Sequence, residues 1–141
     1  MNIRDVMTPN PRVVSPGDSI QNAARIMRDC DTGAVPVVDN GRPVGMVTDR
    51  DIVIRAVAED GQLNRLVRDI VSSGVVCASP DMSTREAEEL MSGHQIRRLP
   101  VVENDRIVGI VSLGDIAVKE AKDKRTGDTL EHISEGVKER G

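Results

Sequence analysis

The pattern of apolar and polar positions predicts the same amphipathic helix twice. In the first copy the positions of the buried stripe are Ile20, Ala23, Ala24 and Met27. In the second copy the corresponding stripe is Thr84, Ala87, Leu90 and Met91. Spacings of three, four and seven residues in the first copy, and of three, six and seven in the second, are typical of a helix with one buried face. Ser19 and Ser83 stand at favourable N-cap positions, so we expect helices over residues 19–29 and 83–93.

Each of these helices is followed by two short apolar runs that predict a β-hairpin. In the first copy the runs cover residues 34–39 and 43–48, with Asn40-Gly41-Arg42 between them. Asn-Gly between β-branched runs is a strong signal for a tight hairpin turn. The second copy has Asn104-Asp105-Arg106, which tolerates the same turn. Further helices are expected at about 49–59 and 113–124.

The chain repeats itself at an offset of 64 residues. Residues 3–52 align with 67–116 without a gap, and 17 of the 50 aligned positions are identical. Each copy is predicted to run strand, helix, hairpin, helix, and alone has too little apolar area for a stable core. We therefore expect an α/β (α+β-like) fold of two pseudo-symmetric repeats. Each would be a small mixed sheet with two helices, and the repeats would pack sheet to sheet.

The repeat also sets the expected domain boundaries. The first repeat should occupy 1–61, with a core of about 3–59, and the second 62–124, with a core of about 67–122. The polar stretch 58–65 is the expected linker, and a short helix is predicted to lead into the second repeat. Its apolar positions are Leu63, Leu66, Val67 and Ile70.

The C-terminal tail, residues 125–141, lies outside the repeat. Thr126-Gly127 is expected to end the preceding helix, and Asp128 or Thr129 to cap a short further one. The apolar positions of that helix are Leu130, Ile133 and Val137. Such a tail either packs back on the repeats, docks a partner or frays as a terminus.

Composition excludes several classes of partner. The chain contains no Phe, Tyr or Trp and has a net charge of −4. Without aromatic rings there is no stacking platform for single-stranded nucleic acid, and the negative charge disfavours a broad surface for phosphate backbones. No apolar run approaches the length that spans a membrane. Cys30 and Cys77 form no metal or redox spacing motif. We expect a cytoplasmic protein with neither nucleic-acid nor membrane partners.

Both copies end in a hydroxyl residue followed three positions later by aspartate. The pairs are Thr48 with Asp51 and Ser112 with Asp115. This spacing is that of a capping box at a helix N-terminus. The same geometry suits a nucleotide, because a helix N-terminus attracts anions and an acidic side chain can accept hydrogen bonds from ribose hydroxyls. The two interpretations are compatible.

The paired pattern VPVV…G.VT..D resembles CBS domains, named for cystathionine β-synthase, in a tandem pair called a Bateman module. The resemblance covers roughly residues 3–120. It implies that Asp51 and Asp115 bind ribose beside Thr48 and Ser112, and that the backbone before each Pro-Val-Val strand contacts adenine. It also implies that the basic residues of HQIRRLPVV, namely Arg97 and Arg98, reach nucleotide phosphates, and we expect Arg50 to do so in the first copy.

Two nucleotide sites are therefore expected, one in each repeat. The first would comprise Gly33, Ala34, Val35, Pro36, Thr48, Arg50 and Asp51. The second would comprise Arg97, Arg98, Leu99, Pro100, Ser112 and Asp115. The copies differ, because Gly33-Ala34 stands where the second copy has Arg97-Arg98, so the two sites need not be equivalent.

The resemblance implies a regulatory module that binds AMP, ADP, ATP or NAD, forms a homodimer and signals to an unidentified effector protein. Catalysis has little support, because His94 and His132 lie in no triad or metalloprotease pattern, and no cofactor is required. A metal- or redox-responsive role stays open, since Cys30 and His94 occupy corresponding positions in the two copies. A purely structural interaction module with unused pockets is the other alternative.

Overall fold

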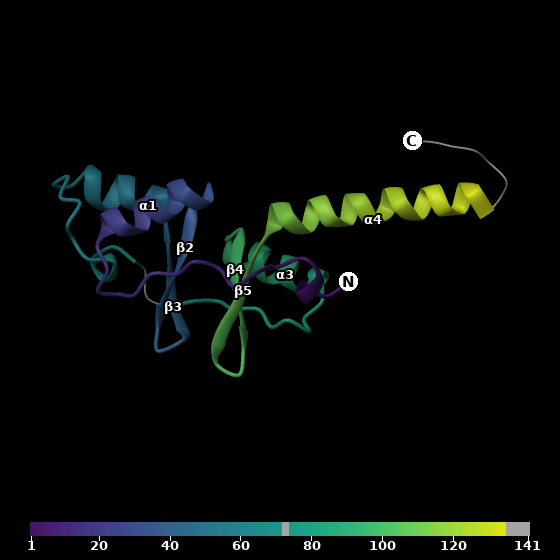
Figure 1. Ribbon diagram of the computed structural model, residues 1–141, viewed down its shortest axis with the longest axis horizontal. Helices are drawn as coiled ribbons and strands as arrows, with labels where there is room; N and C mark the ends of the chain where they lie inside the picture. Colours follow the sequence, from purple (N-terminus) through teal and green to yellow (C-terminus); the bar gives the residue numbers. More distant parts are fainter. Residues whose placement is uncertain (72–73, 135–141) are drawn as a thin grey trace.

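The protein consists of two similar lobes whose hairpins lie side by side, as the computed structural model shows (Figure 1). The structure describes residues 1–71 and 74–134, and of residues 125–134 only the backbone. The first lobe has a core that runs from Val14 to Ile70. The core of the second lobe combines Ile3 with residues from Ala78 to Ile116.

Each lobe contains the helix and hairpin that the sequence predicts. In the first lobe these are α1 (Ile20–Cys30), β2 (Ala34–Asp39) and β3 (Arg42–Thr48). In the second they are α3 (Thr84–His94), β4 (Arg98–Glu103) and β5 (Arg106–Ser112). The hydroxyls of Ser19 and Ser83 accept hydrogen bonds from the amides of Asn22 and Glu86, which confirms both N-caps.

The two hairpins turn as their sequences predict. Asn40 and Gly41 have φ values of 53° and 82°, and Asn104 and Asp105 have φ values of 53° and 63°. Positive φ at both central residues is the conformation whose twist matches the flanking strands. Both sheets are antiparallel rather than mixed, and isolated parallel bridges join Val14 to Val37 and Ala78 to Val101. β3 lies against β4 and β5, so the lobes meet sheet to sheet.

The first segment of each repeat packs on the other lobe. η1 (Ile3–Asp5) contributes Ile3 to the second core, and the Ile3 amide donates to the Met82 carbonyl at 2.9 Å. The equivalent η3 (Val67–Asp69) contributes Val67 to the first core, and the Val67 amide donates to the Asp18 carbonyl at 2.8 Å. The sequence repeat and the packing unit therefore differ, because the two lobes exchange these segments.

β1 (Thr8–Pro9) continues this exchange by pairing with β5 in the second lobe. Thr8 lies opposite Ile110 and Pro9 opposite Gly109. A Cβ atom on Gly109 would come within 2.6 Å of Met7 Sδ and 3.0 Å of the Thr8 carbonyl oxygen. Glycine at this position lets the N-terminal strand approach closely, and the chain then crosses from the second lobe to the first.

The helices that follow the hairpins differ between the lobes. In the first lobe α2 (Asp49–Ile52) is followed by a π-helical turn, η2 (Val53–Val57). In the second lobe α4 (Leu113–Ser134) runs on past the body of the molecule (Figure 1). Among the helices described, none is long and apolar enough to cross a membrane.

The predicted helix break at Thr126-Gly127 is wrong. The backbone stays helical through Ser134, so the expected separate helix after Asp128 does not form, and Val137 lies outside the described residues. A single glycine inside a helix costs about 1 kcal/mol relative to alanine. The surrounding Lys, Glu and Ala residues favour helix strongly enough to continue across it.

Candidate functional site

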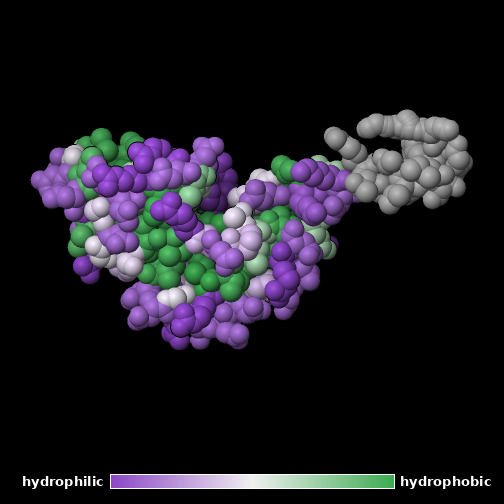
Figure 2. All heavy atoms as spheres, in the orientation of Figure 1, coloured by the Kyte–Doolittle hydropathy of each residue, from purple (hydrophilic) through white to green (hydrophobic). Residues whose placement is uncertain are grey.

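Two cavities lie at the junction of the lobes, where apolar surface gathers in Figure 2. The Asp115 cleft, with a volume of about 450 Å³, contains Ser112, Asp115, Arg98 and Arg12 in its wall. The Thr48 cleft, with a volume of about 430 Å³, contains Thr48, Arg50, Arg97 and Arg98. Volumes of this size suit small-molecule ligands, for which pockets of about 300–1,000 Å³ are usual.

The two clefts are related by the offset of 64 residues. Ile110 and Ser112 in the Asp115 cleft correspond to Met46 and Thr48 in the Thr48 cleft. Ala34 and Arg98, which correspond to each other, lie in the wall of both clefts. The pair of clefts therefore follows the pseudo-symmetry of the chain and shares one wall.

Each cleft draws its residues from both lobes, which corrects the grouping expected from the sequence. Gly33, Ala34, Val35 and Pro36 line the Asp115 cleft, although they belong to the first repeat. Arg97, Arg98 and Pro100 line the Thr48 cleft, although they belong to the second. The hairpins face each other. The start of β2 therefore lies near the end of β5, and the start of β4 lies near the end of β3.

The Asp115 carboxylate is exposed at the cleft wall and available to bind a ligand. The Asp115 amide donates to Ser112 Oγ at 3.0 Å, which is half of a capping box. Among the described residues, no group donates a hydrogen bond to the Asp115 side chain, which is exposed at the cleft wall. An exposed carboxylate beside a hydroxyl can accept hydrogen bonds from a vicinal diol without first giving up a partner.

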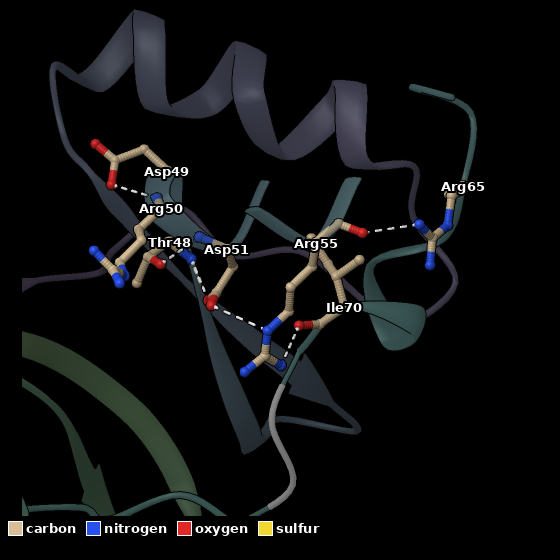
Figure 3. A network of polar contacts seen from close by, with 7 residues as sticks. All are labelled: Thr48, Asp49, Arg50, Asp51, Arg55, Arg65 and Ile70. Atoms are coloured by element: carbon tan, nitrogen blue, oxygen red, sulfur yellow. Dashed lines mark hydrogen bonds and ion pairs between the residues drawn. The ribbon is translucent and has the colours of Figure 1, made fainter. Parts of the chain in front are cut away.

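The Thr48 end has a complete capping box instead (Figure 3). The Asp51 amide donates to Thr48 Oγ1 at 3.1 Å, and the Thr48 amide donates to Asp51 Oδ2 at 3.0 Å. Asp51 also lies 3.9 Å from Arg55 Nε, and Arg55 donates to the Ile70 carbonyl at 3.1 Å. The Asp51 side chain is 20% exposed and is not part of the Thr48 cleft wall. In the structure, Asp51 therefore stabilises the N-terminus of α2.

Leu99 is another predicted site residue that the structure places elsewhere. Its side chain is fully buried in the core of the second lobe and lines neither cleft. Alternate side chains of a strand point to opposite faces. Arg98 and Pro100 therefore face the clefts while Leu99 packs beneath them.

Sequence reasoning missed Arg12, which brings a second guanidinium to the Asp115 cleft. Its side chain is 57% exposed and lies 4.0 Å from Asp29. Asn10 and Thr32 also line this cleft and were missed. No motif marks Arg12, because Val76 stands at the corresponding position of the second copy. It reaches the cleft only because the N-terminal segment crosses between the lobes.

Cys30, Cys77 and His94 do not come together as a metal site among the side chains that the structure describes. Among the side chains of residues 1–71 and 74–124, no group of three His, Cys, Asp or Glu residues is close enough to hold an ion. Cys30 lies in the wall of the Asp115 cleft, whereas His94 is exposed on the far end of α3. Burial raises the pKa of the Cys77 thiol, which disfavours the thiolate that binds metal.

Two gap-free repeats that exchange their first segments and enclose two related clefts define a pseudo-symmetric tandem-repeat module. The family model for the CBS domain matches residues 3–57 and 67–121, and the chain belongs to this family as a tandem pair.

Several known proteins resemble the whole module. The CBS domain-containing protein YhcV of Bacillus subtilis is 42% identical over 133 residues, which cover 94% of this chain and 95% of YhcV. The crystal structure of hypoxic response protein I with two coordinated zinc ions has a TM-score of 0.76 and 35% identity, and the match covers 83% of this chain and 97% of that one. The CBS domain pair of protein MJ0100, in complex with 5′-methylthioadenosine and S-adenosyl-L-methionine, has a TM-score of 0.76 and 28% identity. That match covers 87% of this chain and 98% of the other.

Proposed function

We propose that this CBS pair is a non-catalytic regulatory module that binds adenosine nucleotides in the clefts between its lobes. The observation that carries the proposal is the free Asp115 carboxylate beside Ser112, in a cavity of about 450 Å³ that also contains Arg98. Ribose would bond to Asp115 and Ser112, and the phosphates to Arg98 and Arg12. The adenosine-type ligands of the MJ0100 pair support this ligand class.

Adenine would rest against aliphatic side chains and backbone. Ile26, Val35 and Ile110 contribute apolar surface to the Asp115 cleft. The backbone of Gly33–Pro36 would supply hydrogen bonds to the ring edge. With no aromatic residue in the chain, no ring can stack on adenine, so apolar contact would take the place of stacking.

The nucleotide would act as a signal because it touches both lobes. A ligand shifts a conformational equilibrium by its difference in affinity for the two states. A nucleotide that contacts Gly33–Pro36 of one lobe and Ser112 and Asp115 of the other favours the packing in which these groups are close. AMP, ADP, ATP and NAD differ in their phosphates, so the arginines of the clefts would bind them with different affinities. The packing of the lobes would then depend on the energy or redox state of the cell, and an effector protein would bind one packing in preference to the other.

Absorption spectroscopy provides the first test. A chain without Trp, Tyr or Phe is nearly transparent above 250 nm, so a band near 260 nm would come from a bound ligand. The purified protein would be denatured and filtered, and the filtrate identified by mass spectrometry. An adenosine nucleotide in the filtrate supports the proposal. A blank spectrum, followed by calorimetric titrations with AMP, ATP and NAD that show no binding, overturns it in favour of a structural module.

We also propose that two copies form a homodimer through exposed apolar helix faces. Val53, Ile54 and Val57 are 56%, 47% and 54% exposed on η2, and Val118 of α4 is 56% exposed. Val118 is the pseudo-symmetric counterpart of Ile54, so a two-fold axis can bring like faces together. The Ile54→Asp and Val118→Asp double variant is expected to be monomeric by light scattering, where the parent chain is dimeric. A parent chain that is itself monomeric contradicts the proposal.

A further inference from the structure

Arg98 occupies the wall that the two clefts share. It is the first residue of β4 and lies opposite Ser112 in the register of the β4–β5 hairpin. Its side chain is half-buried and contributes to both cavities. Across the residues whose side chains the structure describes, Arg98 forms no ion pair and no side-chain hydrogen bond. An anion in either cleft would therefore find it available.

The other arginines of the site each serve one cleft. Arg12 lines only the Asp115 cleft, and Arg50 and Arg97 line only the Thr48 cleft. The pseudo-symmetric counterpart of Arg98 is Ala34, which lies opposite Thr48 and also borders both cavities. Of the two positions in the shared wall, one thus carries a guanidinium and the other a methyl group.

From this placement we propose that Arg98 is a phosphate ligand for which the two clefts compete, so that a nucleotide bound in one cleft weakens binding in the other. The inference rests on the proposed nucleotide binding. A guanidinium presents a rigid fork of donors that aligns with one phosphate at a time in the bidentate geometry. Whichever nucleotide binds first orients Arg98 towards its own cleft, and the second nucleotide binds without it.

The size of the effect follows from the kind of bond that is lost. A hydrogen bond to a charged group contributes about 1.5–3 kcal/mol, which corresponds to roughly ten- to hundred-fold in affinity. The second binding step should be weaker by about this factor than binding to the same cleft when the other is disabled. Adenosine has no phosphate, so it should bind to the two clefts independently.

Calorimetric titration with AMP and with adenosine tests the competition. Asp115→Ala disables one cleft, and the Arg50→Glu and Arg97→Glu double variant disables the other. Each of these variants gives the AMP affinity of one cleft alone. In the parent chain, the second AMP should bind about ten- to hundred-fold more weakly than AMP binds to the weaker of these two single clefts. This difference in affinity is the gap that the next variants test. Arg98→Ala should remove that gap, because it makes the shared wall alike on both sides. Arg97→Gly, which copies Gly33, should preserve the gap, since Arg97 touches one cleft alone.

Three outcomes overturn the inference. An AMP isotherm of the parent chain equal to the sum of the two single-cleft isotherms means that the clefts are independent. A gap that persists in Arg98→Ala means that repulsion between the two bound phosphates, rather than competition for Arg98, separates the steps. A second step tighter than the first means that Arg98 bridges both ligands. These outcomes leave the proposed function intact, whereas an absence of any binding of AMP or adenosine overturns both.

Discussion

Asp115→Ala is expected to weaken AMP binding in the Asp115 cleft roughly ten- to hundred-fold, which is about 1.5–3 kcal/mol of binding free energy. The carboxylate is exposed at the cleft wall and has no donor among the described residues. Both ribose hydroxyls can therefore donate to it without displacing a protein group. The fold should survive the substitution, because the Ser112 hydroxyl still accepts from the amide of residue 115 at the helix start.

A titration with 2′-deoxy-AMP isolates the contact between Asp115 and ribose. The deoxy ligand should bind more weakly than AMP to the parent chain, and the difference should vanish in Asp115→Ala. Non-additive losses of this kind identify a direct interaction between the two altered groups. If 2′-deoxy-AMP binds more weakly than AMP by the same factor in the parent chain and in Asp115→Ala, Asp115 does not bind the ribose.

Asp51→Ala is the matched control because it changes the corresponding aspartate of the first copy. Its carboxylate accepts from the Thr48 amide at 3.0 Å and lies 3.9 Å from Arg55, so its loss removes one of the two hydrogen bonds of the capping box. Loss of one such hydrogen bond lowers the free energy of unfolding by about 0.5–1.5 kcal/mol. A nucleotide that used Asp51 would first have to break this hydrogen bond. Asp51→Ala should therefore lose more stability and less AMP affinity than Asp115→Ala.

Local features of the fold were predictable because short stretches of sequence determine them. Asn40-Gly41 requires positive φ values that these two residues adopt readily, and the turn forms as predicted. The predicted capping box at Thr48 and Asp51 is complete, because its groups are three residues apart. The offset of 64 residues then predicted a second lobe built like the first.

The assembly of the clefts could not be predicted, because it depends on contacts between residues far apart in the chain. Nothing in the local sequence of Gly33 indicates that it faces Asp115 rather than Asp51. The position of Arg12 depends on a segment that leaves the second lobe after β1. The repeat in the sequence predicts two related clefts, but the exchange of segments decides which residues share a cleft.

Ile3→Ala should lower the free energy of unfolding by about 2–5 kcal/mol. Ile3 is fully buried in the core of the second lobe, although it is only two residues from the N-terminus. Removing its side chain deletes apolar contact and leaves a cavity under the exchanged segment. Typical domains have a total stability of about 5–15 kcal/mol, so this loss is large. Denaturation in urea followed by far-ultraviolet circular dichroism measures it without aromatic fluorescence.

Val44→Ala provides the control for Ile3→Ala, since Val44 is 40% exposed, lies outside the proposed dimer face, and an exposed substitution should stay within about 0.5 kcal/mol. The exchanged segment continues from Ile3 through β1 to Asn10 and Arg12, which line the Asp115 cleft. Loosening that segment should therefore also weaken AMP binding, although Ile3 touches neither cleft. If Ile3→Ala changes neither stability nor affinity, the N-terminal segment does not pack on the second lobe in solution. Loss of both properties together would link the exchange of segments to the formation of the binding site.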